Sequence, residues 1–396
     1  MTLELELAAR FLRRRSGVLL RGTALAAFAG VALATAALVI TLALMNGYRS
    51  AIAGALQRGN AHLVGFAPKP LSLAEAERIA DAMAGLEGVA RAVPVTYLTG
   101  LLDDPEEPTT PLPVVLKAVA EPPPFCGLQS WPDGDLPAAV FGDRLAAVLG
   151  LGDGATVTVR LPPSSGSWVV PTLRLRCIGR FRLEFSEFDS RWIVVPLEPI
   201  QEALPGTGVG AVEVELDDPL AVERMRANLE AVAPGLILTD WREMNAVLFA
   251  ALRWQTLSLF VVLSLVVAVA SFQVSSALVV LAIDKRRTTG MLQAVGARPA
   301  MVRRILVLAG AILGGVGIGV GLVLGCLISG LMSWLELVRF PEGLARVYMV
   351  DHIPLLVSAA HLAAVAAVCS LLVLAASWWP AWRSSRLDPV ASLKAV

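Results

Sequence analysis

Four long apolar segments alternate with polar ones along the chain. A bilayer core about 30 Å thick needs roughly 20 apolar residues per helix, and four segments reach that length: Thr23–Met45, Leu257–Ile283, Ile305–Leu331 and Ile353–Trp379. A long, mostly polar stretch separates the first from the second. The pattern predicts an α-helical membrane protein with four transmembrane helices and one large domain inserted between helices 1 and 2.

The pattern divides the chain into nine segments. They are an amphipathic helix (1–22), transmembrane helix 1 (23–46), the inserted domain (47–254), transmembrane helix 2 (255–283), a short loop with its own helix (284–304), transmembrane helix 3 (305–332), a second loop (333–352), transmembrane helix 4 (353–379) and a tail (380–396).

Within the inserted domain, strand-like alternation and helical periodicity both occur, bounded by Gly, Pro and Asp. The predicted strands are Val114–Val119, Thr156–Leu161, Leu173–Phe181, Ile193–Pro196 and Ala211–Leu216; the predicted helices are Leu73–Ala84, Asp143–Leu149 and Pro219–Val232. Their irregular order predicts an α+β domain of two lobes.

The positive charges are unevenly distributed, although the net charge is zero. Arg and Lys gather before helix 1, between helices 2 and 3, and after helix 4, whereas the loop between helices 3 and 4 has only Arg339 and Arg346. By the positive-inside rule, both termini and the first loop are expected in the cytoplasm and the inserted domain on the other side.

The N-terminal segment places Leu5, Ala8, Ala9 and Leu12 on one helical stripe, which predicts an amphipathic helix on the cytoplasmic leaflet. The apolar run that follows is longer than the ~7–15 residues of a signal-peptide core. We therefore expect this run to remain as a transmembrane helix.

Catalytic and metal-binding patterns are missing from the sequence. None of the four lysines follows a glycine, so the chain has no phosphate-binding loop of the G-x-x-x-x-G-K-[ST] type. The three histidines are isolated, and no Cys/His spacing suits a metal. His361, inside helix 4, is a functional candidate, but a hydrogen bond to a neighbouring helix is the preferred interpretation. Whether Cys126 and Cys177 of the inserted domain form a disulfide is left open by the sequence.

Two segments of the inserted domain allow two interpretations each. Between two strands, Pro162, Pro163, Trp168 and Pro171 frame a hairpin that either recognises a protein or covers its own domain. Phe185–Trp192 alternates aromatic and charged residues, which indicates either a groove or, as we prefer, a strand edge.

Helices 2 and 3 differ in side-chain size. Helix 3 is rich in glycine, and several of its glycines are four residues apart, which favours close helix packing. Helix 2 presents bulky residues suited to packing or to an acyl-lined cavity. In the loop between them, Met291, Leu292 and Val295 share one helical turn and Gly296 is a plausible C-cap. This loop helix either docks on a partner or lies on anionic lipid.

Several local motifs resemble the FtsX/MacB superfamily of ABC-transporter permeases, and within it the lipoprotein-releasing permeases. They are Leu44–Tyr48, Phe185–Pro196, Asp240–Asn245, Asp284–Arg287 with Gly296-Ala297, Tyr348–Pro354 and Pro380–Arg383 with Leu387–Val390. The loop and tail motifs are superfamily-wide, whereas Met-Asn-Gly-Tyr and Phe-Asp-Ser point to the lipoprotein-releasing branch.

The resemblance implies an inner-membrane permease, a homo- or heterodimer on a separate ATPase that holds the ATP and Mg²⁺, with no cofactor or nucleic acid bound by this chain. It implies three sites. The coupling helix would use Arg287, Gly290, Met291, Leu292, Val295, Gly296 and Ala297. A cavity for a triacylated lipoprotein would use Met45, Asn46, Tyr48, Phe260, Leu263 and Phe272. A periplasmic lipoprotein chaperone would bind the Pro162–Pro171 hairpin.

The sequence departs from the resemblance at Arg286–Gly290, where an acidic residue, Ile and a small residue are usual, and in the compact hairpin. Two alternatives remain open. One is a permease of the same architecture that exports a drug or peptide with a periplasmic adaptor, or activates a cell-wall hydrolase. The other is a receptor or scaffold without transport.

Overall fold

The computed structural model describes residues 2–13, 18–103, 111–163, 170–218, 221–338 and 352–384. The chain forms two compact units. The membrane unit comprises Met1–Arg49, Ala250–Val338 and Ile353–Val396, and the inserted domain comprises Ser50–Phe249 with Arg339–His352.

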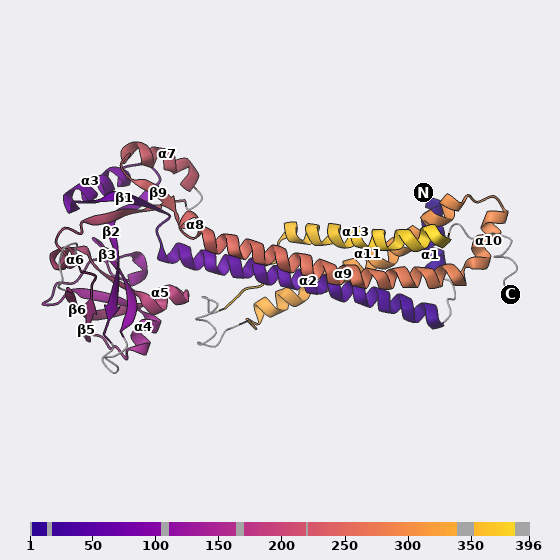
Figure 1. The fold of residues 1–396 in the computed structure, drawn as a ribbon, viewed down its shortest axis with the longest axis horizontal. Helices are drawn as coiled ribbons and strands as arrows, with labels where there is room; N and C mark the ends of the chain where they lie inside the picture. The colour runs from indigo at the N-terminus through magenta and orange to yellow at the C-terminus, as the bar shows by residue number, and fades with distance from the viewer. Residues whose placement is uncertain are drawn as a thin grey trace. The chain divides into compact units, whose positions relative to one another are not determined.

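In the described part of the chain, four helices are long and apolar enough to cross a membrane, which confirms the predicted number. They run side by side in the membrane unit (Figure 1): α2 (Val18–Gly59), α9 (Ala246–Asp284), α11 (Pro299–Trp334) and α13 (Ala359–Ser384). The first three extend beyond their predicted spans. Helix α13 instead begins six residues later than predicted, because the segment before it hydrogen-bonds with α2 through the N–H and carbonyl of Leu356.

Glycines let α11 pack closely against two neighbours. A Cβ at Gly321 or Gly325 would overlap atoms of α2, and a Cβ at Gly310 or Gly314 would overlap Ser377 or Val373 of α13. In lipid, such small-residue faces allow the close backbone approach that holds helices together. The packing interpretation of the glycines is therefore confirmed. Gly315, on another face of α11, has no neighbour within 4 Å among the described atoms.

The N-terminal helix α1 (Thr2–Arg13) packs on α11 through one face. Ala8 and Phe11 are buried in the membrane-unit core, whereas Leu5 is 53% exposed. The Glu4 carboxylate lies 3.6 Å from the Arg304 guanidinium of α11. Of the predicted stripe, Ala8 therefore contacts the protein, while Leu5 stays available for the leaflet. Helix α2 begins at Val18, within the predicted segment 1–22.

Nine strands in the described part of the inserted domain form one continuous sheet. Six of them pair in a closed ring. Strand β2 pairs with β3, β3 with β7, β7 with β4, β4 with β6, β6 with β5, and β5 again with β2. These six strands, hereafter the barrel, are β2 (Val89–Leu102), β3 (Leu112–Val119), β4 (Ala138–Gly142), β5 (Thr156–Arg160), β6 (Thr172–Phe181) and β7 (Trp192–Pro196).

From the long strand β2 the same sheet continues in the order β2-β8-β1-β9, and this part is hereafter called the second sheet. Its other strands are β1 (Leu63–Leu71), β8 (Val209–Leu216) and β9 (Ile237–Asp240). Helices α3 (Leu73–Ala84) and α7 (Val222–Val232) lie beside this sheet (Figure 1) and share an apolar core with it. A separate core fills the barrel. The predicted two-lobed α+β fold is confirmed, with β2 common to both lobes.

Short helices connect the barrel strands. They are the 3-10 helix η1 (Pro124–Cys126), α4 (Asp143–Val148), α5 (Ser186–Arg191) and α6 (Leu197–Ala203). Helix α5 corrects our expectation of a strand edge at Phe185–Trp192. Its aromatic residues point into the core, where Phe185 and Phe188 are buried with ring centroids 4.9 Å apart.

Candidate functional site

The loop helix α10 (Arg286–Ala294) exposes an apolar face. Met291 is 48% and Val295 91% exposed, one helical turn apart, whereas Leu292 packs against the membrane-unit core. Gly296 ends the helix at φ +105°: its N–H bonds the Gln293 carbonyl, and the Ala297 N–H bonds the Leu292 carbonyl at 2.9 Å. This is a Schellman C-cap, so the predicted role of Gly296 agrees with the backbone.

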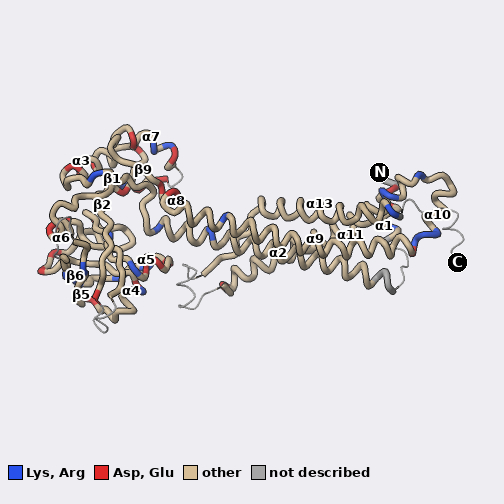
Figure 2. The backbone as a smooth tube through the Cα atoms, in the orientation of Figure 1, with Lys and Arg blue, Asp and Glu red and all other residues tan. Residues whose placement is uncertain are grey.

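The surroundings of α10 are cationic. Lys285 pairs with Asp284 at 2.7 Å and is followed by Arg286 and Arg287. Figure 2 shows basic segments on α1 and α10, near one end of membrane helices that carry little charge over most of their length. Met291 and Val295 form a small exposed apolar group surrounded by basic residues. Such a surface suits docking into an apolar groove with an acidic rim.

The first half of α9 has little cover within the chain. None of residues 253–266, all of which the structure describes, is buried, whereas Val267, Ala270 and Val274 in the second half are. Of the predicted cavity residues on this helix, Phe272 is 67% exposed, while Phe260 and Leu263 pack partly against the helix core. Within residues 253–266, the large exposed apolar side chains are Trp254, Leu257, Val261, Val262, Leu265 and Val266.

The Met-Asn-Gly-Tyr motif of α2 holds the segment before α13. The Asn46 side chain donates to the Leu356 carbonyl at 2.9 Å, and the Leu356 N–H donates to the Ala43 carbonyl at 3.1 Å. A Cβ at Gly47 would collide with the backbone oxygen of Pro354. We call Ala43, Asn46, Gly47, Pro354 and Leu356 the clamp. Asn46 is thus engaged in packing; Met45 and Tyr48 are half-buried beside it.

His361 of α13 does not make the expected hydrogen bond through Nδ1. This atom is buried without a partner among the described residues, beside a cavity of about 10 Å³ lined by Leu42, Ala43 and Ser358, among others. That volume is close to the minimum for one water molecule.

The predicted chaperone hairpin is formed by β5 and β6. Pro162 and Pro163 are exposed, Pro171 is half-buried, and the Leu161 N–H donates to the Pro171 carbonyl at 2.9 Å. Trp168 lies outside the described residues.

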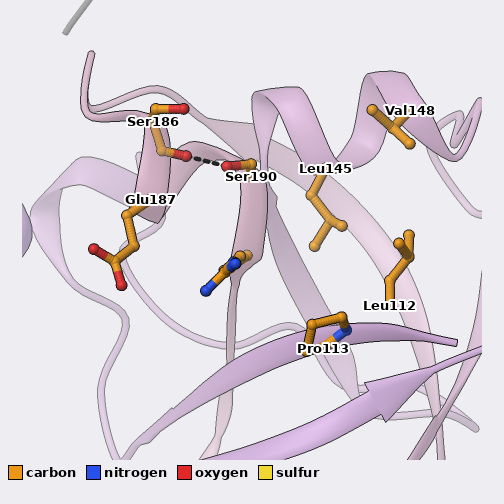
Figure 3. Close-up of a pocket in the computed structure, with 8 residues that line it drawn as sticks. Leu112, Pro113, Leu145, Val148, Ser186, Glu187 and Ser190 are labelled. Carbon is orange, nitrogen blue, oxygen red and sulfur yellow. Dashed lines mark hydrogen bonds between the residues drawn. The ribbon is translucent and has the colours of Figure 1, made fainter. Parts of the chain in front are cut away.

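A pocket of about 440 Å³ opens beside α5 (Figure 3). One wall is apolar and comes from β3 and α4, with Leu112, Pro113, Leu145 and Val148; the other is polar and comes from α5, with Ser186, Glu187, Ser190 and Arg191. Glu187 and Arg191 of the Phe185–Trp192 motif therefore line a pocket, while Asp189 and the aromatic residues of the motif are buried.

The start of α9 is positioned by a capping box that sequence reasoning missed. In the short helix α8 (Trp241–Met244), the Glu243 N–H donates to Asp240, and the Glu243 carboxylate accepts from the Asp240 N–H at 3.0 Å. Arg226 pairs with the same carboxylate at 2.8 Å and holds the pKa of Glu243 below its usual value. The D-x-x-E spacing is the signal that could have revealed it.

Cys126 and Cys177 are free thiols, which answers the disulfide question for this structure. Burial raises the pKa of the Cys126 thiol to about 12, despite the nearby positive charges of Lys117 and Arg91. In the described residues no group of three His, Cys, Asp or Glu side chains could hold a metal ion.

The inserted domain is expected to lose stability below pH 6.5 through His62. Its Nδ1 accepts from the Leu216 N–H at 2.9 Å, and burial lowers its pKa, partly offset by Glu215. The unfolded chain, with a His pKa near 6.5, then takes up a proton first as the pH falls. The stability that His62 contributes is therefore fully present above pH 6.5. It declines as the pH falls toward the lowered pKa of His62 in the folded chain.

The measurement is thermal unfolding of the full chain at pH 7.5 and 5.5, with hydrogen exchange at Leu216. His62→Asn should reduce the difference between the two pH values, and His352→Asn, at an exposed position, should not. An equal pH difference in wild type and His62→Asn would refute the role of His62.

Four apolar helices, an α+β domain inserted after the first, and a small loop helix between the second and third define a permease-type membrane subunit. Two family models match the chain: the MacB-like periplasmic core domain over residues 23–232 and the FtsX-like permease C-terminal domain over residues 258–389. The chain belongs to the FtsX/MacB family of permeases.

Curated relatives match over nearly the full length. The chain is 25% identical over 420 residues to the lipoprotein-releasing system transmembrane protein LolC of Xylella fastidiosa (strain 9a5c), covering 99% of this chain and 98% of the relative. It is 26% identical to LolC of Neisseria meningitidis serogroup B, covering 99% of both. LolE of Haemophilus influenzae is 24% identical over 64% of each chain.

Among solved structures, the periplasmic region of MacB from Actinobacillus actinomycetemcomitans matches with a TM-score of 0.30 and 13% identity. The match covers 47% of this chain and 91% of that one.

Proposed function

We propose that this chain is the permease subunit of an ABC transporter that extracts triacylated lipoproteins from the inner membrane and passes them to a soluble periplasmic chaperone. The observation that carries the proposal is the full-length similarity to lipoprotein-releasing permeases. It is supported by the first half of α9, whose bulky apolar side chains are free to contact acyl chains.

In this proposal both termini and α10 are cytoplasmic and the inserted domain is periplasmic, as the distribution of Arg and Lys favours. A separate ATPase subunit, which binds ATP and Mg²⁺, receives Met291 and Val295 of α10. A second permease subunit faces α9, so that the acyl chains lie between two subunits. ATP-driven closure then changes the relative populations of an open and a closed state.

The Pro162–Pro171 hairpin is the proposed contact for the chaperone. Pro162 and Pro163 before the loop and Pro171 after it have restricted backbone angles, which lowers the entropy lost on binding.

Photo-crosslinking tests where the lipoprotein lies. With p-benzoylphenylalanine at Val261 or Phe272 of α9, we expect a crosslink to a triacylated lipoprotein in membranes that carry the assembled complex without ATP. The matched control is Leu327 of α11, which is equally apolar and 62% exposed. Crosslinks of equal yield at all three positions would show only general lipid contact and would contradict the proposed cavity.

A further inference from the structure

Lys117 is a lysine buried within an otherwise apolar strand. It lies on β3 and is 1% exposed, and its ammonium group is 2.8 Å from the Glu213 carboxylate of β8, which is 4% exposed. A charge taken out of water is retained only where partners compensate it. The partners of the Lys117 ammonium group therefore show which strands and helices it connects.

The partners come from both lobes of the inserted domain. Lys117 belongs to the barrel and Glu213 to the second sheet, while Tyr97 lies opposite Lys117 on the shared strand β2. The Tyr97 hydroxyl donates to the Glu213 carboxylate. Burial and the charge of Glu213 raise the pKa of Tyr97 well above its usual value, so the hydroxyl keeps its proton. The three side chains join three adjacent strands where the two lobes meet.

The same ammonium group reaches the end of the first membrane helix. Lys117 Nζ donates to the carbonyl of Gly59, the last residue of α2, at 3.4 Å. A cation at a helix C-terminus interacts favourably with the helix dipole and satisfies a carbonyl that has no partner within the helix. The rings of Phe125 and Trp192 have their centroids 5.7 Å from Nζ, which adds cation–π attraction.

The last turn of α2 is also held by close packing. A Cβ at Gly59 would overlap the Phe188 ring of α5, and the Arg58 guanidinium donates to the Leu183 carbonyl at 3.2 Å. Helix α2 runs without interruption from Val18 to Gly59. Its C-terminal end is therefore a fixed part of the inserted domain.

We propose that Lys117 is a positioning residue that fixes the end of α2 to the barrel and the second sheet together, so that a displacement of α2 moves both lobes as one body. This inference rests on the proposed function for its transport consequence. The junction of Lys117, Glu213, Tyr97 and Gly59 is tested separately from transport.

The test uses the full chain assembled with its ATPase and two double variants. Lys117→Met with Glu213→Gln removes the cation but keeps an acceptor for Tyr97, and it avoids leaving a buried carboxylate unpaired. The control is Arg91→Met with Glu215→Gln. Arg91 and Glu215 also form an ion pair, at 3.9 Å, between register partners on β2 and β8, and Arg91 also donates to the Glu121 and Pro122 carbonyls.

Hydrogen exchange is the first readout. We expect amides of Ile52–Gly59 to exchange about 10-fold faster in the Lys117 variant, with α3 unchanged, and no such change in the control. If the exchange rates of these amides were unchanged in the Lys117 variant, or rose equally in the control, Lys117 would not hold the end of α2.

Lipoprotein released per ATP hydrolysed is the second readout, and it should fall about 5-fold in the Lys117 variant while the basal ATPase rate stays the same. A normal ratio together with faster exchange would overturn the positioning role. If the wild-type complex releases no lipoprotein, the proposed function fails, and the exchange result still decides the junction.

Discussion

Replacing Gly47 by alanine is expected to open the clamp between α2 and the segment that precedes α13. The new Cβ would occupy the position of the Pro354 backbone oxygen, so the segment must move and the hydrogen bonds of Asn46 and Ala43 to Leu356 must break. Overpacking of this kind costs about 1–3 kcal/mol, and the lost hydrogen bonds add to that cost. Faster hydrogen exchange at the Leu356 amide and a lower thermal midpoint in detergent are the measurements.

Gly22→Ala is the matched control, because it makes the same change on the same helix at a position where, apart from its own helical turn, no described atom lies within 4 Å of the new Cβ. Alanine is favoured over glycine in a helix by roughly 0.5–1 kcal/mol, so this control should be neutral or slightly stabilising. If Gly47→Ala behaved like Gly22→Ala, the close approach of Pro354 would not exist in the folded protein.

Met291→Asp is expected to uncouple ATP hydrolysis from lipoprotein release while the chain still folds. Met291 is half-exposed on α10, so the aspartate is solvated in the free chain. On docking, the carboxylate would lose water inside an apolar groove, which is strongly unfavourable. We expect at least about a 10-fold loss of release per ATP, or ~1.4 kcal/mol of coupling.

Met244→Asp introduces the same charge at a methionine that is 39% exposed in α8, a helix of the inserted domain. It should leave coupling unchanged. Normal coupling in Met291→Asp would show that α10 is not the element that contacts the ATPase.

The membrane architecture was predictable because length and hydropathy alone decide whether a helix can span lipid. The glycines of α11 were also interpretable, since their spacing of four places them on shared helical faces. The packing of α1 on α11 was not predictable. Its burial is set by contact with α11, including Glu4 with Arg304, and an isolated amphipathic pattern carries no information on that partner.

In the inserted domain, the strands with clear alternation were found, whereas β1, β2, β4 and β9 were missed. Strand β4 is buried at every position and has no alternation to detect, and β2 serves two lobes with different faces. Lys117 was visible only as a lone lysine in an apolar strand, and its partners on β2, β8 and α2 come from distant parts of the sequence. Asn46 and Gly47 stood out as a motif, but their role in the clamp depends on Pro354 and Leu356, more than 300 residues away.

Transport of a lipoprotein is tested most directly by reconstitution. The complex of this chain with its ATPase and second permease subunit is placed in liposomes that carry a triacylated lipoprotein, and release to a soluble periplasmic chaperone is followed. The proposal predicts release that requires ATP, the complex and the chaperone, and that is lost in Met291→Asp. An assembled complex that hydrolyses ATP while the lipoprotein stays in the membrane would contradict it.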